Sequence, residues 1–260
     1  MWVTLSFLLG VCAVSWMEWK VAVCVLTIYM LYLPAKRDSL RKWMPMFPWL
    51  RNTHCKLSYS GRVDILSDRD TPRLFVFRPH GLHCVGACLM GSDPFMSHLR
   101  IACSSVLFWL PIVKEFVGWA GAFPCHSEDI RAMLKSKQSV VLYPGGLNEI
   151  PGATYLQTYK RRTGFIKLAM ELGVDIVPCW VDGENELYDV CHPFPTLQHW
   201  CYRQFRYPWP LISWGWQWVP FLPKSNPLTV IVGDPITTHP SGSIEVYDEQ
   251  CQQFYNKIKK

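Results

Sequence analysis

The chain has 260 residues, enough for one substantial globular domain and a short appendage. Half of the residues are hydrophobic and 13 are Trp, which is more apolar than a soluble enzyme requires and favours association with a membrane. The net charge of +6 is spread along the chain without an aromatic-basic recognition module, which argues against nucleic acid and suits an anionic membrane face or a phosphate-bearing ligand.

The 11 cysteines form no C-x-x-C pair, so their number and spacing indicate neither a disulfide framework nor a zinc ribbon. We expect reduced thiols that pack as small apolar side chains. A helix could bring His80, His83 and Cys84 to one side as metal ligands, but packed core residues explain the same segment, and no metal is predicted.

Two uncharged stretches, residues 2–17 and 21–35, open the chain, and each is shorter than the about 20 residues of a simple transmembrane helix. They predict either a hairpin that dips into the bilayer, with Glu18 and Lys20 at its turn, or one long helix interrupted by these two charges. A cleaved signal peptide is the alternative, but the basic start and the small-residue cleavage site of such a peptide are missing.

The flank after these stretches is basic, with Lys36, Arg37, Arg41 and Lys42, whereas the first residues carry no basic side chain. The positive-inside rule therefore places position 36 in the cytosol. We divide the chain into a membrane-anchoring segment at 1–44 and a single cytosol-facing domain at 45–260.

Strands and helices alternate within this domain. Apolar runs predict buried strands at 73–77, 139–143, 174–181 and 228–232. Helices are predicted from Ser127 as the N-cap, from about Arg162 to a C′ glycine at Gly173, and over 244–258. This alternation predicts an α/β sandwich.

A histidine follows the first predicted strand, in Phe77-Arg78-Pro79-His80-Gly81. Its ordinary pKa of about 6.5 suits a general base that takes a proton from an alcohol, and Gly81 allows a close approach of substrate. A hydrogen-bonded core histidine would leave the same pattern.

Two other strand ends carry carboxylates. The turn Pro144-Gly145-Gly146 leads to Glu149, and Glu184 lies in the polar cluster after the strand at 174–181. A plain turn with a solvated glutamate is the simpler reading of the Glu149 segment. Because α/β proteins build their sites at strand ends, however, we expect one His and two Glu to converge.

Five spaced motifs resemble the diacylglycerol acyltransferase type 2 family, over roughly residues 45–258. They occur in the order typical of that family: Pro79-His80-Gly81, Tyr143-Pro144-Gly145-Gly146 with Glu149, Arg162-Thr163-Gly164-Phe165, Val177-Pro178, and Gly183-Glu184-Asn185-Glu186. The resemblance implies a mixed sheet flanked by helices, as in glycerolipid acyltransferases, and transfer of an acyl group from acyl-coenzyme A to a lipid alcohol.

The resemblance also implies roles for single residues. His80 matches the catalytic histidine, with Glu149 and Glu184 as the candidate acids. Arg78 stands where the family usually has a second His, and Val85 where the wider superfamily has an Asp, so the acid that orients His80 stays open between the two glutamates. Expected substrate contacts are Arg78, Gly81, Gly145, Gly146 and Asn148, together with Arg161 and Arg162 for the coenzyme A phosphates.

No cofactor is expected beyond acyl-coenzyme A as cosubstrate. The expected acceptor is a neutral acylglycerol, diacylglycerol first, with monoacylglycerol, a wax alcohol or a lysophospholipid as alternatives, and a non-catalytic lipid-binding protein as the alternative of another class. The segments 101–123 and 209–218 are aromatic and nearly uncharged, which suits a lipid-facing entrance or an interfacial belt as well as an ordinary core. We expect the endoplasmic reticulum membrane as the location; a homo-oligomer is compatible with all of this.

Overall fold

The computed structural model describes residues 46–93, 96, 98–109, 113–156, 162–205, 207–219 and 222–259. The hairpin or helix predicted at 1–44 and the side chain of Arg161 lie outside the described residues. None of the helices within these ranges has the length and hydrophobicity needed to cross a membrane.

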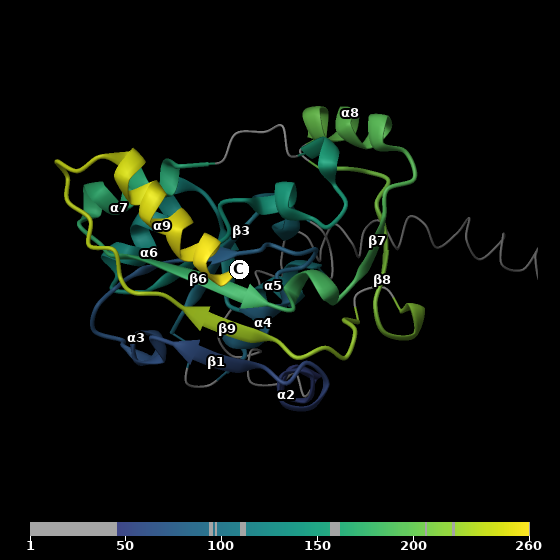
Figure 1. The fold of residues 1–260 in the computed structure, drawn as a ribbon, viewed down its shortest axis with the longest axis horizontal. Helices are drawn as coiled ribbons and strands as arrows, with labels where there is room; N and C mark the ends of the chain where they lie inside the picture. Colours follow the sequence, from purple (N-terminus) through teal and green to yellow (C-terminus); the bar gives the residue numbers. More distant parts are fainter. Residues whose placement is uncertain are drawn as a thin grey trace, which may run out of the picture.

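A seven-stranded mixed sheet forms the centre of the molecule, in the order β1-β9-β6-β2-β5-β3-β4 (Figure 1). The five strands from β6 to β4 are parallel, while β9 is antiparallel to β6 and parallel to β1. The five parallel strands therefore end at one edge of the sheet. Their bounds are β1 Ser58–Gly61, β2 Leu74–Arg78, β3 Arg100–Cys103, β4 Ala122–Pro124, β5 Val140–Leu142, β6 Ile176–Asp182 and β9 Thr229–Val232.

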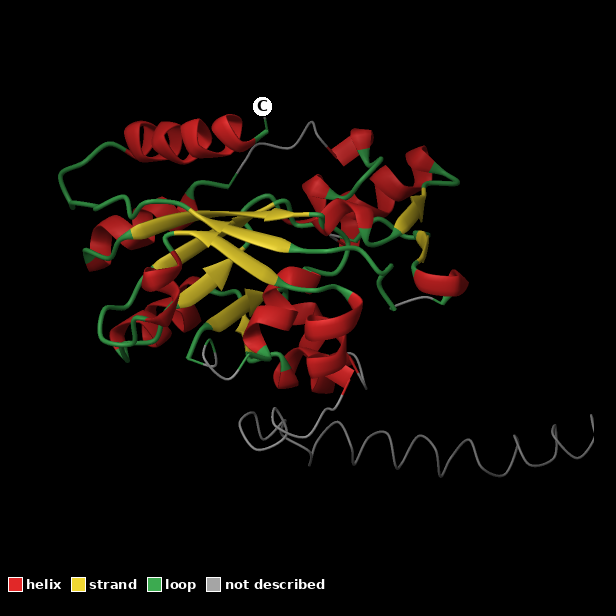
Figure 2. Cartoon of the chain, turned by 60° about the horizontal axis from the view of Figure 1, so that its bottom comes forward, coloured by secondary structure: helices red, strands yellow, loops and turns green. Residues whose placement is uncertain are grey.

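Helices cover both faces of this sheet (Figure 2). Phe75 and Phe77 of β2 pack into one core and Leu74 and Val76 into the other, because successive side chains of a strand point to opposite faces. The first core takes in α3 Val63–Ser67, α4 Val85–Gly91 and α5 Val113–Trp119, and the second α6 Ser127–Lys135, α7 Gly164–Leu172 and α9 Ile244–Ile258. Shorter helical segments are α2 Met46–Trp49, η1 Leu50–His54, η2 Ser105–Phe108, η3 Gly146–Glu149, η4 Thr154–Leu156 and η5 Glu184–Glu186.

A smaller unit lies at one end of the molecule, away from the main sheet (Figures 1 and 2). It consists of the antiparallel strands β7 Asp189–Cys191 and β8 Ile212–Trp214, the helix α8 Pro195–Phe205 between them, and the short turn η6 Trp216–Trp218. We call residues 189–219 the aromatic lobe. Tyr202 of α8 joins the lobe to the body, because it is buried with Ile150 and Leu156.

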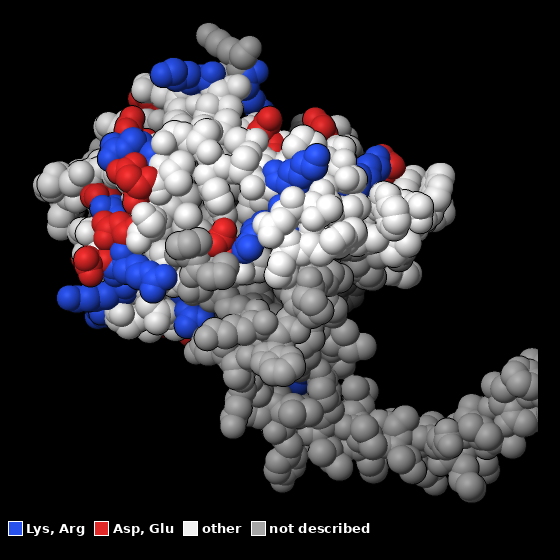
Figure 3. All heavy atoms as spheres, turned by 90° about the horizontal axis from the view of Figure 1, so that it is seen from below, with Lys and Arg blue, Asp and Glu red and all other residues white. Residues whose placement is uncertain are grey.

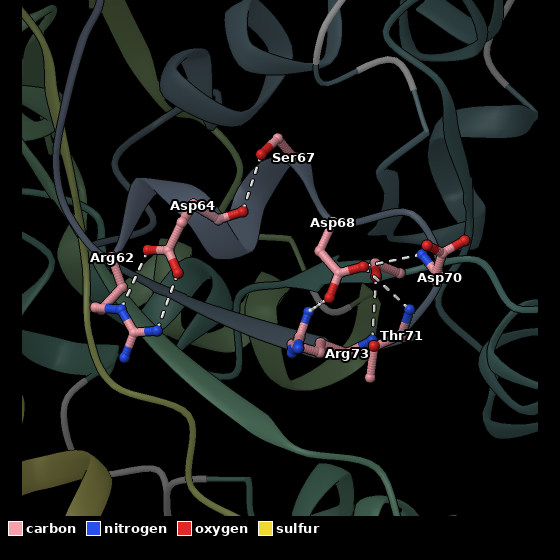
Figure 4. Close-up of polar contacts among 8 residues, drawn as sticks. Arg62, Asp64, Ser67, Asp68, Asp70, Thr71 and Arg73 are labelled. Carbon is pink, nitrogen blue, oxygen red and sulfur yellow. Dashed lines mark hydrogen bonds and ion pairs between the residues drawn. The ribbon is translucent and has the colours of Figure 1, made fainter.

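Polar contacts around α3 hold the chain that leads into β2 (Figure 4). One carboxylate oxygen of Asp68 accepts the backbone N–H groups of Asp70 and Thr71, and the other lies 2.6 Å from Nη1 of Arg73. Arg62 and Asp64 form a second ion pair at 2.9 Å. Asp68 thus fixes the turn immediately before the strand that carries the candidate histidine.

The structure confirms the mixed α/β sheet flanked by helices, and each of the four predicted strands lies within two residues of an observed one. Ser127 is not the N-cap, however. His126 keeps an extended backbone, with φ −97° and ψ 148°, so the chain turns into α6 one residue earlier than predicted. Gly173 ends α7 in the left-handed conformation, with φ +62°, as expected of a C-terminal glycine.

The two aromatic segments differ in their surroundings. In the described part of 101–123, Ile101, Ala102 and Phe123 are buried in the cores, whereas Val106 and Trp109 are exposed. Trp209 and Trp218 are exposed in the aromatic lobe, as an interfacial belt requires.

Candidate active site

His80 lies just beyond the end of β2, at the edge where the parallel strands end. The ring is partly buried, and its edge contacts Tyr143 with 5.4 Å between the ring centroids. Nδ1 lies 2.8 Å from the carbonyl oxygen of Gly81. Because a carbonyl oxygen only accepts hydrogen bonds, this contact requires the proton on Nδ1. The lone pair is then on Nε2, which can accept a proton from a bound group.

The surroundings of His80 favour the neutral ring. Burial lowers the pKa of His80 below its usual 6.5, the Gly81 carbonyl opposes this, and the positive charge of Arg162 lowers the pKa further. The neighbouring His83 is also neutral at pH 7, since burial lowers its pKa to about 4. A general base must be unprotonated before it reacts, and these effects keep His80 in that state.

Glu149 supports the backbone of His80. This carboxylate comes from η3, after the end of β5, and its Oε2 accepts the backbone N–H of His80 at 2.9 Å. Its Oε1 accepts from Nε of Arg78 in a largely buried ion pair. A Cβ atom on Gly145 would lie 2.1 Å from Cδ of Glu149, so the turn needs glycine there. The glycine of this motif thus makes room for the carboxylate that positions the histidine.

Arg78 connects the same group to α9. Its Nη1 donates to Oε1 of Gln252 at 3.1 Å, and its guanidinium lies 5.3 Å from the ring centroid of Tyr255. The Tyr255 hydroxyl donates to the carbonyl of Val76 at 2.8 Å. Two donors of Arg78 are therefore used within the protein, which favours a positioning role over the substrate contact expected from the sequence.

Glu184 fixes the other end of the loop that carries His80. It opens η5 after β6, and its side chain is 2 % exposed. Its two oxygens accept the N–H groups of Val85 and Gly86, at 2.6 and 2.8 Å, where α4 begins. Burial raises the pKa of Glu184 to about 7, and the two amide hydrogen bonds oppose that rise. A Cβ atom on Gly81, whose φ is +59°, would lie 2.7 Å from Cγ of Glu184.

The structure thus brings the three predicted residues to one edge of the sheet, with roles that differ from the expectation. We expected one glutamate to orient the imidazole of His80. In the contacts of the described residues, the imidazole nitrogen meets the Gly81 carbonyl, Glu149 holds the histidine backbone, and Glu184 holds the first turn of α4. The carboxylates act on the loop and not on the ring.

The other residues that were expected to contact the substrate differ in their hydrogen-bond partners and exposure. The N–H of Gly146 donates to the carbonyl of Tyr143 at 3.1 Å, and Oδ1 of Asn148 accepts from the Tyr202 hydroxyl at 3.1 Å. Both groups are thus used within the protein. Arg162 is exposed and close enough to lower the pKa of His80 and of Cys125.

Several residues around the site were not singled out from the sequence. The sequence could have identified Tyr143, because this residue belongs to the Tyr-Pro-Gly-Gly motif that follows β5. Gln252 and Tyr255 share a face of α9 at a spacing of three residues, but no local pattern connects that face to β2. Tyr202 likewise reads as an ordinary core residue of an amphipathic helix.

Cysteines crowd the apolar side of the site without forming a reactive centre. Burial raises the pKa of Cys88 and of Cys103 to about 12 and also raises that of Cys84. Such thiols stay protonated at neutral pH and are poor nucleophiles. Within the described ranges, no group of three His, Cys, Asp or Glu side chains is arranged to hold a metal ion.

Comparisons with known proteins place this chain in a family. Residues 13–260 match the family model described as diacylglycerol acyltransferase. The chain is 30% identical over 195 residues to diacylglycerol O-acyltransferase 2 of Xenopus tropicalis, which covers 63% of this chain and 52% of that protein. It is 31% identical over 186 residues to 2-acylglycerol O-acyltransferase 3 of Homo sapiens, covering 61% and 53%. The chain thus spans about half the length of these two relatives.

A solved structure supports the fold. The crystal structure of the 1-acyl-sn-glycerophosphate acyltransferase PlsC from Thermotoga maritima superposes with a TM-score of 0.50 and 12% identity, over 90% of this chain and 91% of that one. At this identity the similarity concerns architecture alone. The match to the family model, which takes in nearly the whole chain, shows that the chain belongs to the diacylglycerol acyltransferase family.

Proposed function

We propose that this chain is an acyl-coenzyme A-dependent O-acyltransferase that esterifies a neutral lipid alcohol, diacylglycerol first among them, with His80 as the general base. Membership of the family supports the reaction type. The observation that carries the assignment of the base is the contact between Nδ1 of His80 and the Gly81 carbonyl, because it leaves a neutral Nε2 with a free lone pair at the strand edge.

The reaction proceeds by direct transfer. Nε2 of His80 takes the proton of the acceptor hydroxyl as the hydroxyl oxygen attacks the carbonyl carbon of the thioester. The tetrahedral intermediate then collapses, the carbon–sulfur bond breaks, and Nε2 gives the proton to the leaving sulfur of coenzyme A, which returns His80 to its neutral form. The products are an ester and free coenzyme A, and no covalent enzyme intermediate forms.

The anionic cosubstrate is best met by a cation whose charge no carboxylate already balances, and Arg78 is paired with Glu149. Nε and Nη1 of Arg78 and the N–H of Gly146 already donate to acceptors within the protein. We therefore assign to Arg162, and to Arg161 next to it, the contact with the anionic cosubstrate. One well-placed donor to the developing oxyanion is typically worth about 3 kcal/mol.

The setting of the reaction is proposed from the sequence. The apolar segment at 1–44 anchors the protein in the endoplasmic reticulum membrane, and the domain at 45–260 faces the cytosol, where acyl-coenzyme A is available. Membrane lipids then surround the protein and deliver the acceptor.

The test replaces His80 by Asn in the full-length protein. Asn keeps an N–H donor for the Gly81 carbonyl but has no basic nitrogen. Transfer from labelled acyl-coenzyme A to diacylglycerol should fall by a factor of at least about 100, since general-base catalysis contributes that much. The matched control is His239→Asn, because His239 is exposed and lies outside the site.

An acceptor panel completes the experiment, with monoacylglycerol, a long-chain alcohol, lysophosphatidate and glycerol 3-phosphate under the same detergent conditions. Turnover near that of the wild type in His80→Asn would remove His80 as the base. A preference for a phosphorylated acceptor would overturn the neutral-lipid assignment. Transfer to none of the acceptors would favour a non-catalytic lipid-binding protein.

A further inference from the structure

The aromatic lobe exposes an unusual amount of apolar surface. Of the 14 large hydrophobic side chains that are exposed in the described residues, 10 lie between positions 194 and 219. Single exposed apolar residues are normal, but a cluster of this kind marks an interaction surface. These exposed side chains include Leu197, Trp200, Phe205, Trp209 and Trp218.

The turn η6 holds one of these side chains outward at a conformational cost. Gln217 and Trp218 both have left-handed backbone angles, with φ of +48° and +65°, a conformation that costs about 1 kcal/mol or more for a residue with a side chain. Trp218 is nevertheless 75 % exposed, and its ring stacks on Trp214 with 5.4 Å between centroids. Backbone strain that serves no burial indicates a functional constraint.

The exposed face of α8 continues this surface. Leu197 and Trp200 are three residues apart and both are exposed, while Gln198, Cys201 and Tyr202 face the interior. The ring of Trp200 contacts Phe205, with 6.0 Å between centroids. Unlike an ordinary amphipathic helix, α8 therefore carries apolar residues on its solvent side as well as on its buried side.

The charge of the segment selects the kind of partner. Residues 190–233 contain no Asp or Glu, whereas Arg203, Arg206 and Lys224 lie within them. Arg203 is exposed on α8, and Lys224 pairs with Asp189 at 2.7 Å. In Figure 3 the acidic and basic side chains of that face gather mainly on its left side, and the right-hand end, where β7, β8 and η6 lie, is mostly white.

We propose that the aromatic lobe is a second membrane-docking surface, which seats Trp218 and the Leu197 and Trp200 face of α8 among the headgroups of an anionic lipid bilayer. Trp at the boundary and Arg beside it are the residues typical of such an interface. A second copy of the chain fits less well, because the one carboxylate of the lobe, Asp189, is already paired with Lys224, and the exposed Arg203 of each copy would meet a surface with no other acidic side chain.

The same helix ties this surface to the candidate active site. Opposite its exposed face, Tyr202 packs on Ile150 and Leu156 and donates its hydroxyl to Asn148 of η3. The segment η3 also carries Glu149, which holds the backbone of His80. Seating the lobe on a bilayer would thus fix the distance between the lipid surface and the histidine.

Site-directed photo-crosslinking tests the proposal. The full-length protein is reconstituted into vesicles of phosphatidylcholine and phosphatidylserine, with a benzophenone amino acid in place of Trp218 or, in a second variant, Trp200. The control position is Val246, which is 50 % exposed on α9 and lies outside the lobe. After illumination, mass spectrometry counts the lipid adducts. No acyl-coenzyme A or acceptor is added, so the result does not depend on turnover.

We expect lipid adducts at Trp218 and Trp200 to exceed those at Val246 several-fold. Adduct yields at both lobe positions no higher than at Val246 would overturn the proposal. So would a product in which the lobe positions are linked to a second copy of the chain, because that surface would then be a protein interface.

Discussion

Among the described residues, the imidazole of His80 bonds to a carbonyl of its own loop, while a carboxylate holds its backbone N–H. The Gly81 carbonyl sets the tautomer, and burial together with Arg162 lowers the pKa of the ring. Burial is the main cause of the low pKa, and the charge of Arg162 adds to it. Under the proposed function, the charge that contacts the anionic cosubstrate would also favour the unprotonated base.

This dependence predicts the effect of Arg162→Gln on pH dependence. A base works in its unprotonated form, so kcat/KM should fall as the pH falls through the pKa of His80, which lies below 6.5 in the wild type. Removing the charge of Arg162 raises that pKa, and the acidic limb of the profile should move to higher pH. Lys167→Gln, an exposed position on α7, is the control. A limb that stays in place or moves to lower pH would contradict this account.

At the scale of residues, the sequence placed the candidate histidine and both glutamates at strand ends, and the structure brings these three together. The atoms that each carboxylate meets could not be predicted. Whether Glu149 faces a ring nitrogen or a backbone N–H depends on the turn at Gly145 and Gly81, and that conformation is set by packing across the sheet.

At the scale of elements, α4 begins on a buried carboxylate. Glu184 accepts the first two amide groups of the helix and is itself almost fully buried. The raised pKa of Glu184 means that the folded protein favours the protonated carboxyl more than the unfolded chain does. Ionising Glu184 therefore lowers the free energy of unfolding, and this loss depends on pH.

Glu184→Gln should change how stability depends on pH. The folded pKa of about 7 exceeds the ordinary value of 4.5, so the contribution of Glu184 is fully present below about pH 4.5 and is lost as the pH rises through 7. By that linkage the free energy of unfolding declines by about 3 kcal/mol over this interval. Urea unfolding at several pH values should show a shallower decline in Glu184→Gln, whereas Glu186→Gln, exposed in the same turn, should follow the wild type. Equal slopes in all three proteins would exclude the effect.

The sequence predicted four strands of the main sheet and the three helices on one of its faces, and it missed several other elements. The strands β3 and β4 have four and three residues, too few for a period of two to stand out. The helix α8 begins at Pro195 and carries apolar residues on both sides, so no single apolar face marks it as a helix in the sequence. The helix α4, with two glycines among its seven residues, lacks a helical pattern, and its start depends on Glu184 of the distant segment η5.

At the scale of the whole molecule, one small core connects the aromatic lobe to the segment that follows β5. The hydroxyl of Tyr202 bonds to Asn148, and the ring of Tyr202 packs on Ile150 and Leu156. The contact joins two segments that are 54 residues apart. No periodicity within either segment predicts it.

A double-mutant cycle tests whether this contact couples the two parts. Tyr202→Phe and Asn148→Ala should each lower the free energy of unfolding by about 1 kcal/mol, because each leaves one partner of the hydrogen bond without the other. The double variant should lose clearly less than the sum, since both variants remove the same interaction. Tyr207→Phe, which is exposed, serves as the control. Additive losses would mean that the hydroxyl and the amide do not interact.

The order of the strands also bears on how the chain is made. β1 comes early in the sequence, yet among the described strands its partner is β9, and β9 in turn fills the place beside β6. During synthesis, β1 therefore cannot pair with β9 until nearly the whole chain has been translated. A polypeptide that terminates before residue 229 leaves the long apolar edge of β6 open, which makes truncated products substrates for chaperones and proteases.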